Sequence, residues 1–136
     1  SSDLPVVKGY PLQLQQLFAN LISNSLKFCE RKPVLNISFE KVPLGEVSKM
    51  RELKEHAAYV KIIFSDNGIG FDDQYADKLF TIFQRLNHKN AYAGSGIGLA
   101  LCKRIVENHH GIIHASAVPN QGATFFVYLP AADQRD

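Results

Sequence analysis

The sequence predicts an α/β protein of the α+β kind: a two-layer sandwich in which a mixed, mostly antiparallel sheet carries helices on one face. Three observations predict this class. The chain has 136 residues, the length of one domain that buries a single core. Segments with apolar residues at every second position stand next to one another, which favours antiparallel neighbours. Two longer segments repeat their apolar residues at helical spacing.

Composition narrows the classes of function. The chain is 46% hydrophobic and 21% charged, and its net charge of +2 is too small to predict binding to nucleic acid or to a membrane surface. It contains no apolar stretch of about 18 residues, which a membrane-spanning helix needs. Cys29 and Cys102 lack metal-site spacing and favour reduced, buried thiols in a cytoplasmic domain. Whether a longer parent protein is membrane-anchored stays open.

The first half of the chain predicts one helix and two strands. The helix covers residues 11–29, and its apolar face is expected to hold Leu14, Phe18, Leu21, Ile22, Ser25 and Cys29. Residues 34–41 and 58–65 alternate as half-buried strands do. The inward residues expected in the second strand are Ala58, Val60, Ile62 and Phe64. The charged stretch 43–56 predicts a loop with a helical turn at residues 50–55.

The middle of the chain predicts two further helices. A short one covers residues 75–84, with Leu79, Phe80 and Phe83 as its apolar residues. Residues 85–96 are polar and contain glycine, which predicts a mobile loop. The longer helix covers residues 97–109 and ends at Gly111. Its expected buried residues are Ala100, Leu101, Ile105 and Val106.

Two strands close the chain. Residues 112–118 and 123–129 are joined by a turn at residues 119–122, and in the last strand Phe125, Val127 and Leu129 alternate with Phe126 and Tyr128. Residues 131–136 are expected to be a frayed tail. The whole range 1–136 is therefore predicted to be one domain.

Three polar side chains recur at helical spacing in the first predicted helix. Asn20, Asn24 and Lys27 stand at positions i, i+4 and i+7, so they share one narrow face. An ordinary solvated face is the simpler interpretation of such a pattern. Asparagine is a poor helix former, however, and two stacked amides above a lysine offer oxygens to a cation and a positive charge to phosphate.

Two glycine-bearing turns also carry chemistry. Asp66, Gly68 and Gly70 follow a strand, and this pattern is either a plain acidic turn or a carboxylate that accepts from an exocyclic amine. The run from Gly94 to Leu99 leads into a helix, where backbone N–H groups form an anion site. Its spacing matches neither a Walker loop nor a dinucleotide fingerprint. A last small-residue turn contains Thr124, whose hydroxyl is suited to complete a base-binding pocket.

These features occur in one order within one domain length. In that order they resemble the ATP-binding domain, of the Bergerat type, that histidine kinases share with gyrase, the large heat-shock chaperone ATPases and mismatch-repair ATPases. The resemblance covers the chain from Pro11 to Pro130. Residues 20–28 look like the N box, 66–70 the first glycine box, 79–85 the F box of histidine kinases, 94–99 the second glycine box and 122–125 the last.

The resemblance implies a role for each polar residue. Asn24 is expected to bind Mg²⁺, Asn20 to order the phosphates or their waters, and Lys27 to contact a phosphate. Asp66 is expected to accept from the adenine 6-amino group, and Thr124 to hold the water that bridges Asp66 and adenine. These roles together imply a site for ATP with Mg²⁺.

The resemblance also assigns the glycine boxes and the F box. Gly68 and Gly70 are expected to let the nucleotide approach the backbone. The second box is expected to hinge a lid and direct amides at the phosphates; its residues are Gly94, Ser95, Gly96, Ile97, Gly98 and Leu99. Phe80 and Phe83 are expected to anchor that lid by packing.

One position separates the branches of the family. The chaperone, gyrase and mismatch-repair enzymes place a glutamate one helical turn before the metal-binding asparagine, where it activates water as a general base. The matching residue here is Asn20, an amide that takes no proton near neutral pH. This difference favours transfer of the phosphoryl group to another protein over hydrolysis of ATP.

The sequence departs from the family's pattern in three places. Tyr10 stands where many histidine kinases have a capping aspartate. The position of a lid arginine holds His88, followed by Lys89, so the cation for the γ-phosphate stays open among Arg85, His88 and Lys89. Ala123 stands where glycine or serine is usual.

The resemblance implies a protein-histidine kinase of a two-component system. The domain is expected to pass the γ-phosphoryl group of ATP to a histidine on absent dimerisation helices, for relay to a response-regulator aspartate. Alone we expect a cytoplasmic monomer with little activity, and in the full kinase a homodimer, with no nucleic-acid partner. An ATPase of the same fold is the alternative that Asn20 and the F box oppose. A pseudo-kinase interaction module is the alternative that Asn24, Asp66 and the glycine boxes oppose.

Overall fold

Alternating side chains in four strands build a sheet with one strongly apolar face. The computed structural model describes residues 7–27, 32–50, 53, 58–80 and 96–132. The sheet has the order β1-β2-β4-β3 and consists of β1 (Leu35–Lys41), β2 (Tyr59–Asp66), β3 (Ile112–Val118) and β4 (Gly122–Pro130). All pairings among these strands are antiparallel, so the expected mixed character is not found in the described ranges.

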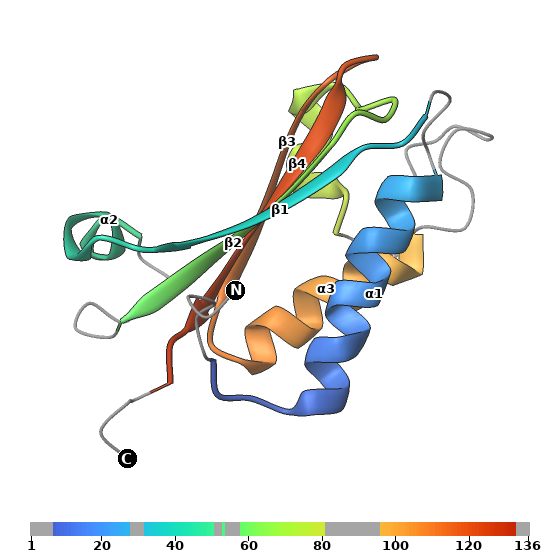
Figure 1. The fold of residues 1–136 in the computed structure, drawn as a ribbon. Coiled ribbons are helices and arrows are strands. Elements are labelled where there is room, and N and C mark those ends of the chain that lie inside the picture. Colours follow the sequence, from blue (N-terminus) through green and yellow to red (C-terminus); the bar gives the residue numbers. More distant parts are fainter. Residues whose placement is uncertain (1–6, 28–31, 51–52, 54–57, 81–95, 133–136) are drawn as a thin grey trace.

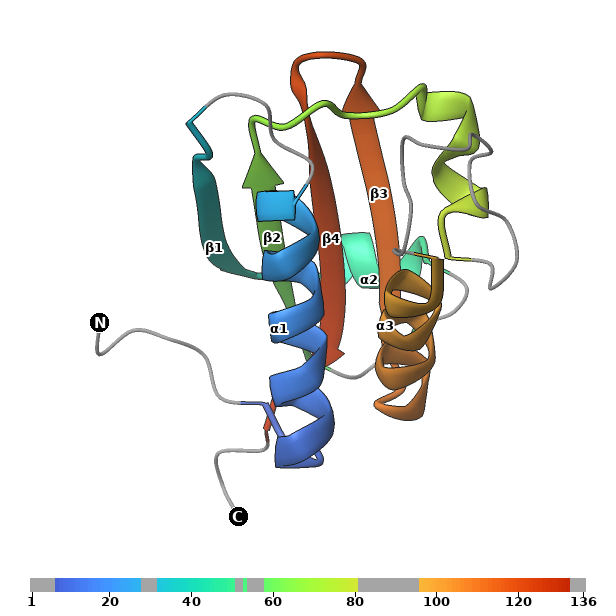
Figure 2. The ribbon, with the colours of Figure 1, turned by 90° about the vertical axis from the view of Figure 1, so that its right-hand side faces the viewer.

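Two helices cover the apolar face of the sheet (Figures 1 and 2). They are α1 (Pro11–Lys27) and α3 (Gly96–Asn108), and α3 ends beside the start of α1. This arrangement confirms the predicted two-layer α+β sandwich. None of the helices in the described ranges is both long and apolar enough to cross a membrane.

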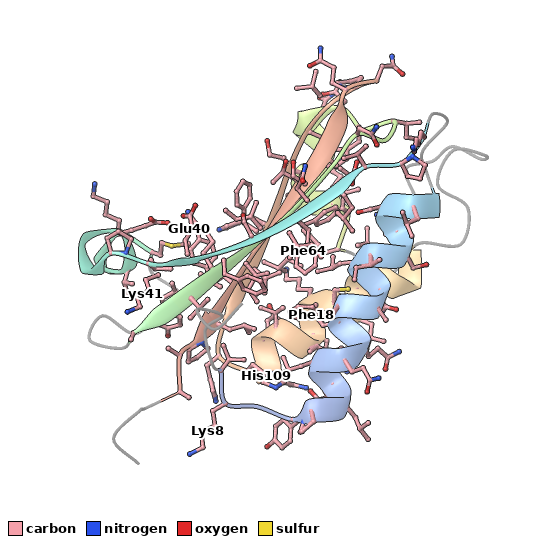
Figure 3. All side chains as sticks on the ribbon, in the orientation of Figure 1. Lys8, Phe18, Glu40, Lys41, Phe64 and His109 are labelled. Carbon is pink, nitrogen blue, oxygen red and sulfur yellow. The ribbon has the colours of Figure 1, made fainter. Side chains whose placement is uncertain are left out.

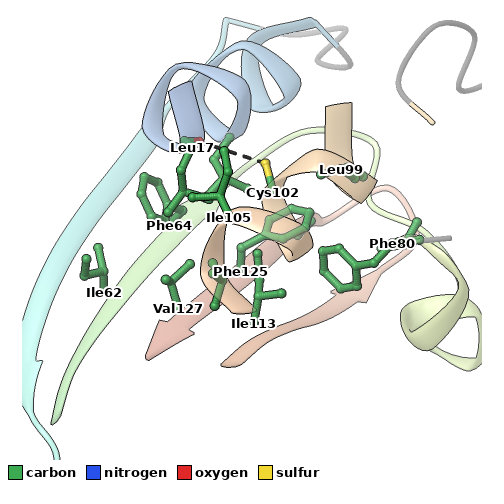
Figure 4. Packing of buried hydrophobic residues seen from close by; sticks show 14 of the residues in the cluster. Leu17, Ile62, Phe64, Phe80, Leu99, Cys102, Ile105, Ile113, Phe125 and Val127 are labelled. Atoms are coloured by element: carbon green, nitrogen blue, oxygen red, sulfur yellow. Dashed lines mark hydrogen bonds between the residues drawn. The ribbon is translucent and has the colours of Figure 1, made fainter. Parts of the chain in front are cut away.

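The core lies between these helices and the two central strands (Figure 4). Its fully or nearly fully buried members include Leu17, Leu21, Ile62, Phe64, Cys102, Ile105, Val106, Phe125, Val127 and Leu129. Burial of each large apolar side chain contributes about 1.5–3 kcal/mol. Phe18 adds an edge-to-face contact with Phe64, with ring centroids 5.4 Å apart (Figure 3).

Most of the predicted inward positions are confirmed, and a few are corrected. In β2, Val60, Ile62 and Phe64 are buried, but Ala58 precedes the strand and is exposed. In α1 the centre of the buried face is Leu17, which the predicted set omitted, whereas its members Leu14, Phe18 and Ile22 are half-buried. In α3, Ala100 and Leu101 are also only half-buried. The helix faces are thus rotated slightly toward the line where α1 and α3 meet.

A third helix lies on the opposite face of the sheet, which corrects the prediction of helices on one face only. It is α2 (Leu44–Ser48), and it precedes the helical turn that was expected at residues 50–55, a segment only partly described. Val47 is fully buried against outward-facing residues of the sheet, among them Tyr59 and Tyr128. Because these aromatic side chains point away from α1 and α3, they need a cover of their own.

The structure also corrects several boundaries. The short helix predicted at residues 75–84 is the 3₁₀ helix η1 (Asp73–Lys78). It starts earlier than predicted because the Asp72 carboxylate accepts from the backbone N–H of Gln74 at 3.1 Å. Residues 81–84 of that prediction and 28–29 of the first helix lie outside the described residues. Ala131 is not frayed, since its N–H donates to the Ala58 carbonyl at 2.9 Å.

The end of α3 differs from the prediction by one residue. His110, with φ of 63°, is the left-handed residue that ends the helix, and Gly111 follows it. Gly111 N–H donates to the Val106 carbonyl at 2.9 Å and His110 N–H to the Glu107 carbonyl at 3.0 Å, which is a Schellman motif. Gly111 is needed for a different reason, because a Cβ there would collide with the Tyr128 carbonyl oxygen.

Candidate functional site

The predicted site residues come from elements that end on one side of the molecule. Figure 2 shows the end of α1, the end of β2 and the turn between β3 and β4 at the same end of the sandwich. Asn20 and Asn24 lie in the second half of α1, Asp66 is the last residue of β2, and Gly98 lies in the first turn of α3. The fold therefore gathers residues that are far apart in the sequence.

Asp66 is held by two backbone amides. Its Oδ1 accepts from Gly68 N–H at 2.8 Å and from Ala123 N–H at 3.2 Å. Asp66 continues the inward alternation of Ile62 and Phe64, so its side chain lies on the helical side of the sheet. Both bonds use Oδ1 in the described part of the chain, which leaves Oδ2 as the oxygen suited to accept from a ligand amine. The half-exposed carboxylate is thus oriented before any ligand binds.

Thr124 and Asp66 lie on paired strands, but their side chains point to opposite faces of the sheet, an arrangement that does not favour the expected water bridge. Thr124 Oγ1 is 3.2 Å from Ser65 Oγ, on the face that also carries Phe126 and Tyr128. Neighbouring residues of a strand point to opposite faces, so the strand turns Ala123 toward Asp66 and Thr124 away from it. The alternation of Phe125 with its neighbours contained this information, since an inward Phe125 makes Thr124 face outward. The contact to Asp66 instead comes from the Ala123 amide.

Two glycines allow the turn after β2 to pack on the turn between β3 and β4. Gly70 has φ of 65° and Gly122 has φ of 130°, a region that side chains disfavour. A Cβ at Gly70 would lie 2.8 Å from the Gly122 carbonyl oxygen, and one at Gly122 would collide with the Asp66 carbonyl oxygen. Asn120 N–H donates to the Ile69 carbonyl at 2.6 Å across the same contact. This packing fixes the backbone that orients Asp66.

Asn20 of α1 contacts the Cys102 thiol of α3. Asn20 and Asn24 are both half-buried. Burial raises the pKa of the Cys102 thiol to about 12, and a hydrogen bond with the Asn20 side chain acts in the opposite direction. Cys102 therefore stays a neutral thiol near pH 7, and it sits against the Asn20 amide between the helices. The predicted reduced and buried state of Cys102 is consistent with its full burial; Cys29 lies outside the described residues.

The start of α3 offers backbone donors. The first N–H groups of a helix have no partner within it, and α3 begins at Gly96. A Cβ built on Gly98 meets no atom of the described residues within 4 Å. The other predicted residues lie outside the described ones, in whole or for their side chains: Lys27, Phe83, Arg85, His88, Lys89, Gly94, Ser95 and Ile97.

Comparison with known proteins identifies the family. Residues 9–133 match the model of the histidine kinase-, DNA gyrase B-, and HSP90-like ATPase family, and the chain therefore belongs to it. The chain is 40% identical over 128 residues to cyanobacterial phytochrome A of Nostoc sp., covering 93% of this chain and 15% of that protein. It is 34% identical over 124 residues to the sensor protein kinase WalK of Staphylococcus haemolyticus, covering 88% of this chain and 18% of that protein.

Solved structures agree with this assignment at the level of the fold. The mycobacterial sensor histidine kinase MprB superposes with a TM-score of 0.72 at 20% identity, covering 92% of this chain and 76% of that one. Full-length ShkA in complex with AMPPNP superposes with a TM-score of 0.72 at 22% identity, covering 95% of this chain and 24% of that one. The chain thus spans about one sixth of the length of the curated relatives named above.

Proposed function

We propose that this chain is the catalytic ATP-binding domain of a two-component sensor histidine kinase. In this proposal it donates the γ-phosphoryl group of ATP to a histidine on a separate helical dimerisation domain, for relay to an aspartate of a response regulator. The observation that carries the nucleotide site is Asp66, whose Oδ1 is held by the Gly68 and Ala123 amides. A fixed carboxylate of this kind selects adenine through its 6-amino group.

The phosphates extend from Asp66 toward α1 and α3 in this proposal. Asn24 supplies an amide oxygen to Mg²⁺, Asn20 orders phosphate oxygens or waters, and Lys27 contacts a phosphate. No group of three or more His, Cys, Asp or Glu side chains able to hold a metal occurs among the described residues. A hard cation here needs oxygens from the triphosphate and water, which suits Mg²⁺. When bound, Mg²⁺ would neutralise part of the negative charge of the phosphates.

The start of α3 and the segment before it complete the site. The amides of Gly96, Gly98 and Leu99 bind the phosphates, with Gly94, Ser95 and Ile97 contributing from the same box. Phe80 and Phe83 anchor the segment before α3 by packing in this proposal, which the edge-to-face contact of Phe80 with Phe125, at 6.2 Å between ring centroids, supports for Phe80. The cation at the γ-phosphate comes from that segment, and Arg85, His88 and Lys89 are its candidates.

Transfer rather than hydrolysis is supported by the chemistry of Asn20. An amide packed against the neutral Cys102 thiol has no basic atom with which to activate water. The reaction then depends on positioning and charge neutralisation, which phosphoryl transfer chiefly requires. The acceptor helices, the response regulator, a homodimeric full kinase and a cytoplasmic location belong to the same proposal. It includes no nucleic-acid partner.

Calorimetric titration with ATP and Mg²⁺ tests the nucleotide site. We expect saturable binding to the wild-type chain and at least about a tenfold loss of affinity in Asp66→Asn, because a charged acceptor for the adenine amine is replaced by an amide. Asp72→Asn is the matched control, since Asp72 is exposed at the start of η1 and asparagine also caps helices. Equal affinities for wild type and Asp66→Asn, or no binding at all, would contradict the proposal.

A further inference from the structure

His109 is a buried polar residue that the nucleotide site does not use. It follows the last residue of α3, and its side chain is 5% exposed. Nδ1 lies 2.8 Å from the Ile105 carbonyl oxygen, and Nε2 lies 3.0 Å from the backbone nitrogen of Tyr10. A backbone N–H only donates, so Nε2 accepts and the ring proton sits on Nδ1, where it donates to Ile105. The neutral imidazole is therefore satisfied at both nitrogens, one on each of two elements.

The chain segment that enters α1 is shaped around this ring (Figure 3). Tyr10 immediately precedes α1, and its carbonyl accepts the first helical hydrogen bond, from Leu14 N–H at 3.0 Å. The Tyr10 ring meets the His109 ring edge to face, with centroids 5.5 Å apart. At Gly9, a Cβ would collide with the imidazole, lying 2.5 Å from Nε2. The segment consequently fits only while residue 9 lacks a side chain.

The contact joins the two helices at the end that is far from the proposed phosphate site. Asn20 and Asn24 lie in the second half of α1, whereas the α3 amides at Gly96 and Gly98 lie at its start. The His109 bond connects the opposite ends of these same helices. A rigid helix that is released at one end shifts at the other, so the angle between α1 and α3 depends on this bond.

We propose that His109 is a positioning residue for nucleotide binding, which clamps the segment of residues 7–10 to the end of α3 and thereby sets the spacing of the two nucleotide-binding helices. The proposal rests on the proposed function. It makes the entering segment a regulator of the site: displacement of residues 7–10 from His109 weakens ATP binding without unfolding the domain. Phenylalanine would fill the same space, but it would leave the Tyr10 N–H without the Nε2 acceptor, while the Ile105 carbonyl would keep the backbone hydrogen bond from His109 N–H at 3.2 Å.

Two substitutions test the roles of the two ring nitrogens of His109 separately. In His109→Asn the amide nitrogen takes the place of Nδ1 and still donates to Ile105, but nothing reaches Tyr10. In His109→Gln the longer side chain places its oxygen near the position of Nε2, so it accepts from Tyr10. His114→Asn is the control, because His114 is an exposed histidine on β3. Gly9→Ala breaks the same contact from the other side without altering α3.

Amide hydrogen exchange and ATP titration of the full 136-residue chain test the clamp. We expect the Tyr10 amide to exchange at least about tenfold faster in His109→Asn and in Gly9→Ala, while core amides such as Ile62 and Val127 stay within about twofold. ATP affinity falls at least about threefold in both variants and returns toward wild type in His109→Gln.

Each contrary result would overturn a defined part of the His109 proposal. Unchanged exchange at Tyr10 in His109→Asn and Gly9→Ala would overturn the clamp, as would a parallel rise at the core amides, which marks general destabilisation. Faster exchange at Tyr10 with unchanged ATP affinity would overturn its link to the nucleotide site. If the wild-type chain binds no ATP, the proposed function fails, while Tyr10 exchange still decides whether His109 holds the entering segment.

Discussion

Several polar residues of this chain are oriented by partners that are far away in the sequence. Asp66 is oriented by the Ala123 amide, which is brought to it by pairing of β2 with β4. Asn20 meets Cys102, and the burial that raises the pKa of this thiol to about 12 keeps it neutral beside the amide. Both sets of contacts orient polar groups of the proposed site.

His110 provides a test of backbone strain at the residue scale. It ends α3 with φ of 63°, where a residue with a Cβ is disfavoured. His110→Gly is expected to raise the free energy of unfolding by about 0.5–1 kcal/mol, measured by urea denaturation. His110→Ala keeps the Cβ and is expected to give no such gain. Equal stabilities of the glycine and alanine variants would show that the left-handed backbone is not the cause.

At the scale of elements, α2 contacts the outer face of the sheet through a polar cluster as well as through the buried Val47. Tyr128 Oη donates to Glu46 Oε2 at 2.9 Å, and Lys61 Nζ lies 3.5 Å from the same carboxylate oxygen and 3.6 Å from Glu40 Oε1. The Lys61 ammonium also lies 5.7 Å from the Tyr128 ring centroid. Burial, the hydrogen bond to Glu46, and the charges of Glu46 and Glu40 raise the pKa of Tyr128 to about 12.

This cluster predicts a dependence of stability on alkaline pH. The pKa of Tyr128 is raised from 10.0 to about 12 in the folded state, so its contribution is present below pH 10 and is lost as pH rises from 10 to 12. Thermal unfolding of Tyr128→Phe is expected to show a loss of about 1 kcal/mol at pH 7 and a smaller further decline between pH 10 and 12 than wild type. Parallel declines of the two proteins in this window would contradict the assignment.

At the scale of the whole molecule, the proposed function has the sandwich bind ATP between α1 and α3 and leaves the phosphoryl acceptor to another domain. The proposed site is built from the end of α1, the end of β2, the start of α3 and the turn between β3 and β4. A domain of this kind is expected to bind ATP and to hydrolyse it poorly, since Asn20 offers no general base.

Release of inorganic phosphate tests this expectation. With ATP and Mg²⁺ in excess, we expect the wild-type chain to release phosphate no more than about twofold faster than Asp66→Asn, whereas a positioned general base contributes about 10²–10⁴-fold. Measurement by a coupled phosphate assay suffices. Turnover far above the Asp66→Asn background would support the rival interpretation of an ATPase of the same fold.

Local pattern was sufficient to predict the elements and most of the core. The two-residue and 3.6-residue periods follow from the geometry of the backbone itself, so Ile62, Phe64, Val127 and Ile105 were assigned correctly to the core without knowledge of their partners. The order of the N box and the glycine boxes likewise identified the family from short segments, as the family match over residues 9–133 confirms.

Tertiary structure alone decided the features that depend on which distant segments meet. The cover of the outer face by α2, the packing of Gly70 against Gly122 and the fit of Gly9 around His109 all arise from long-range contacts. A sequence period states which face a residue occupies, but it does not state what lies opposite that face. The physical reason is that periodicity is set within a single helix or strand. The orientation of the Asp66 carboxylate or the His109 imidazole is set by hydrogen bonds between two different segments of the chain.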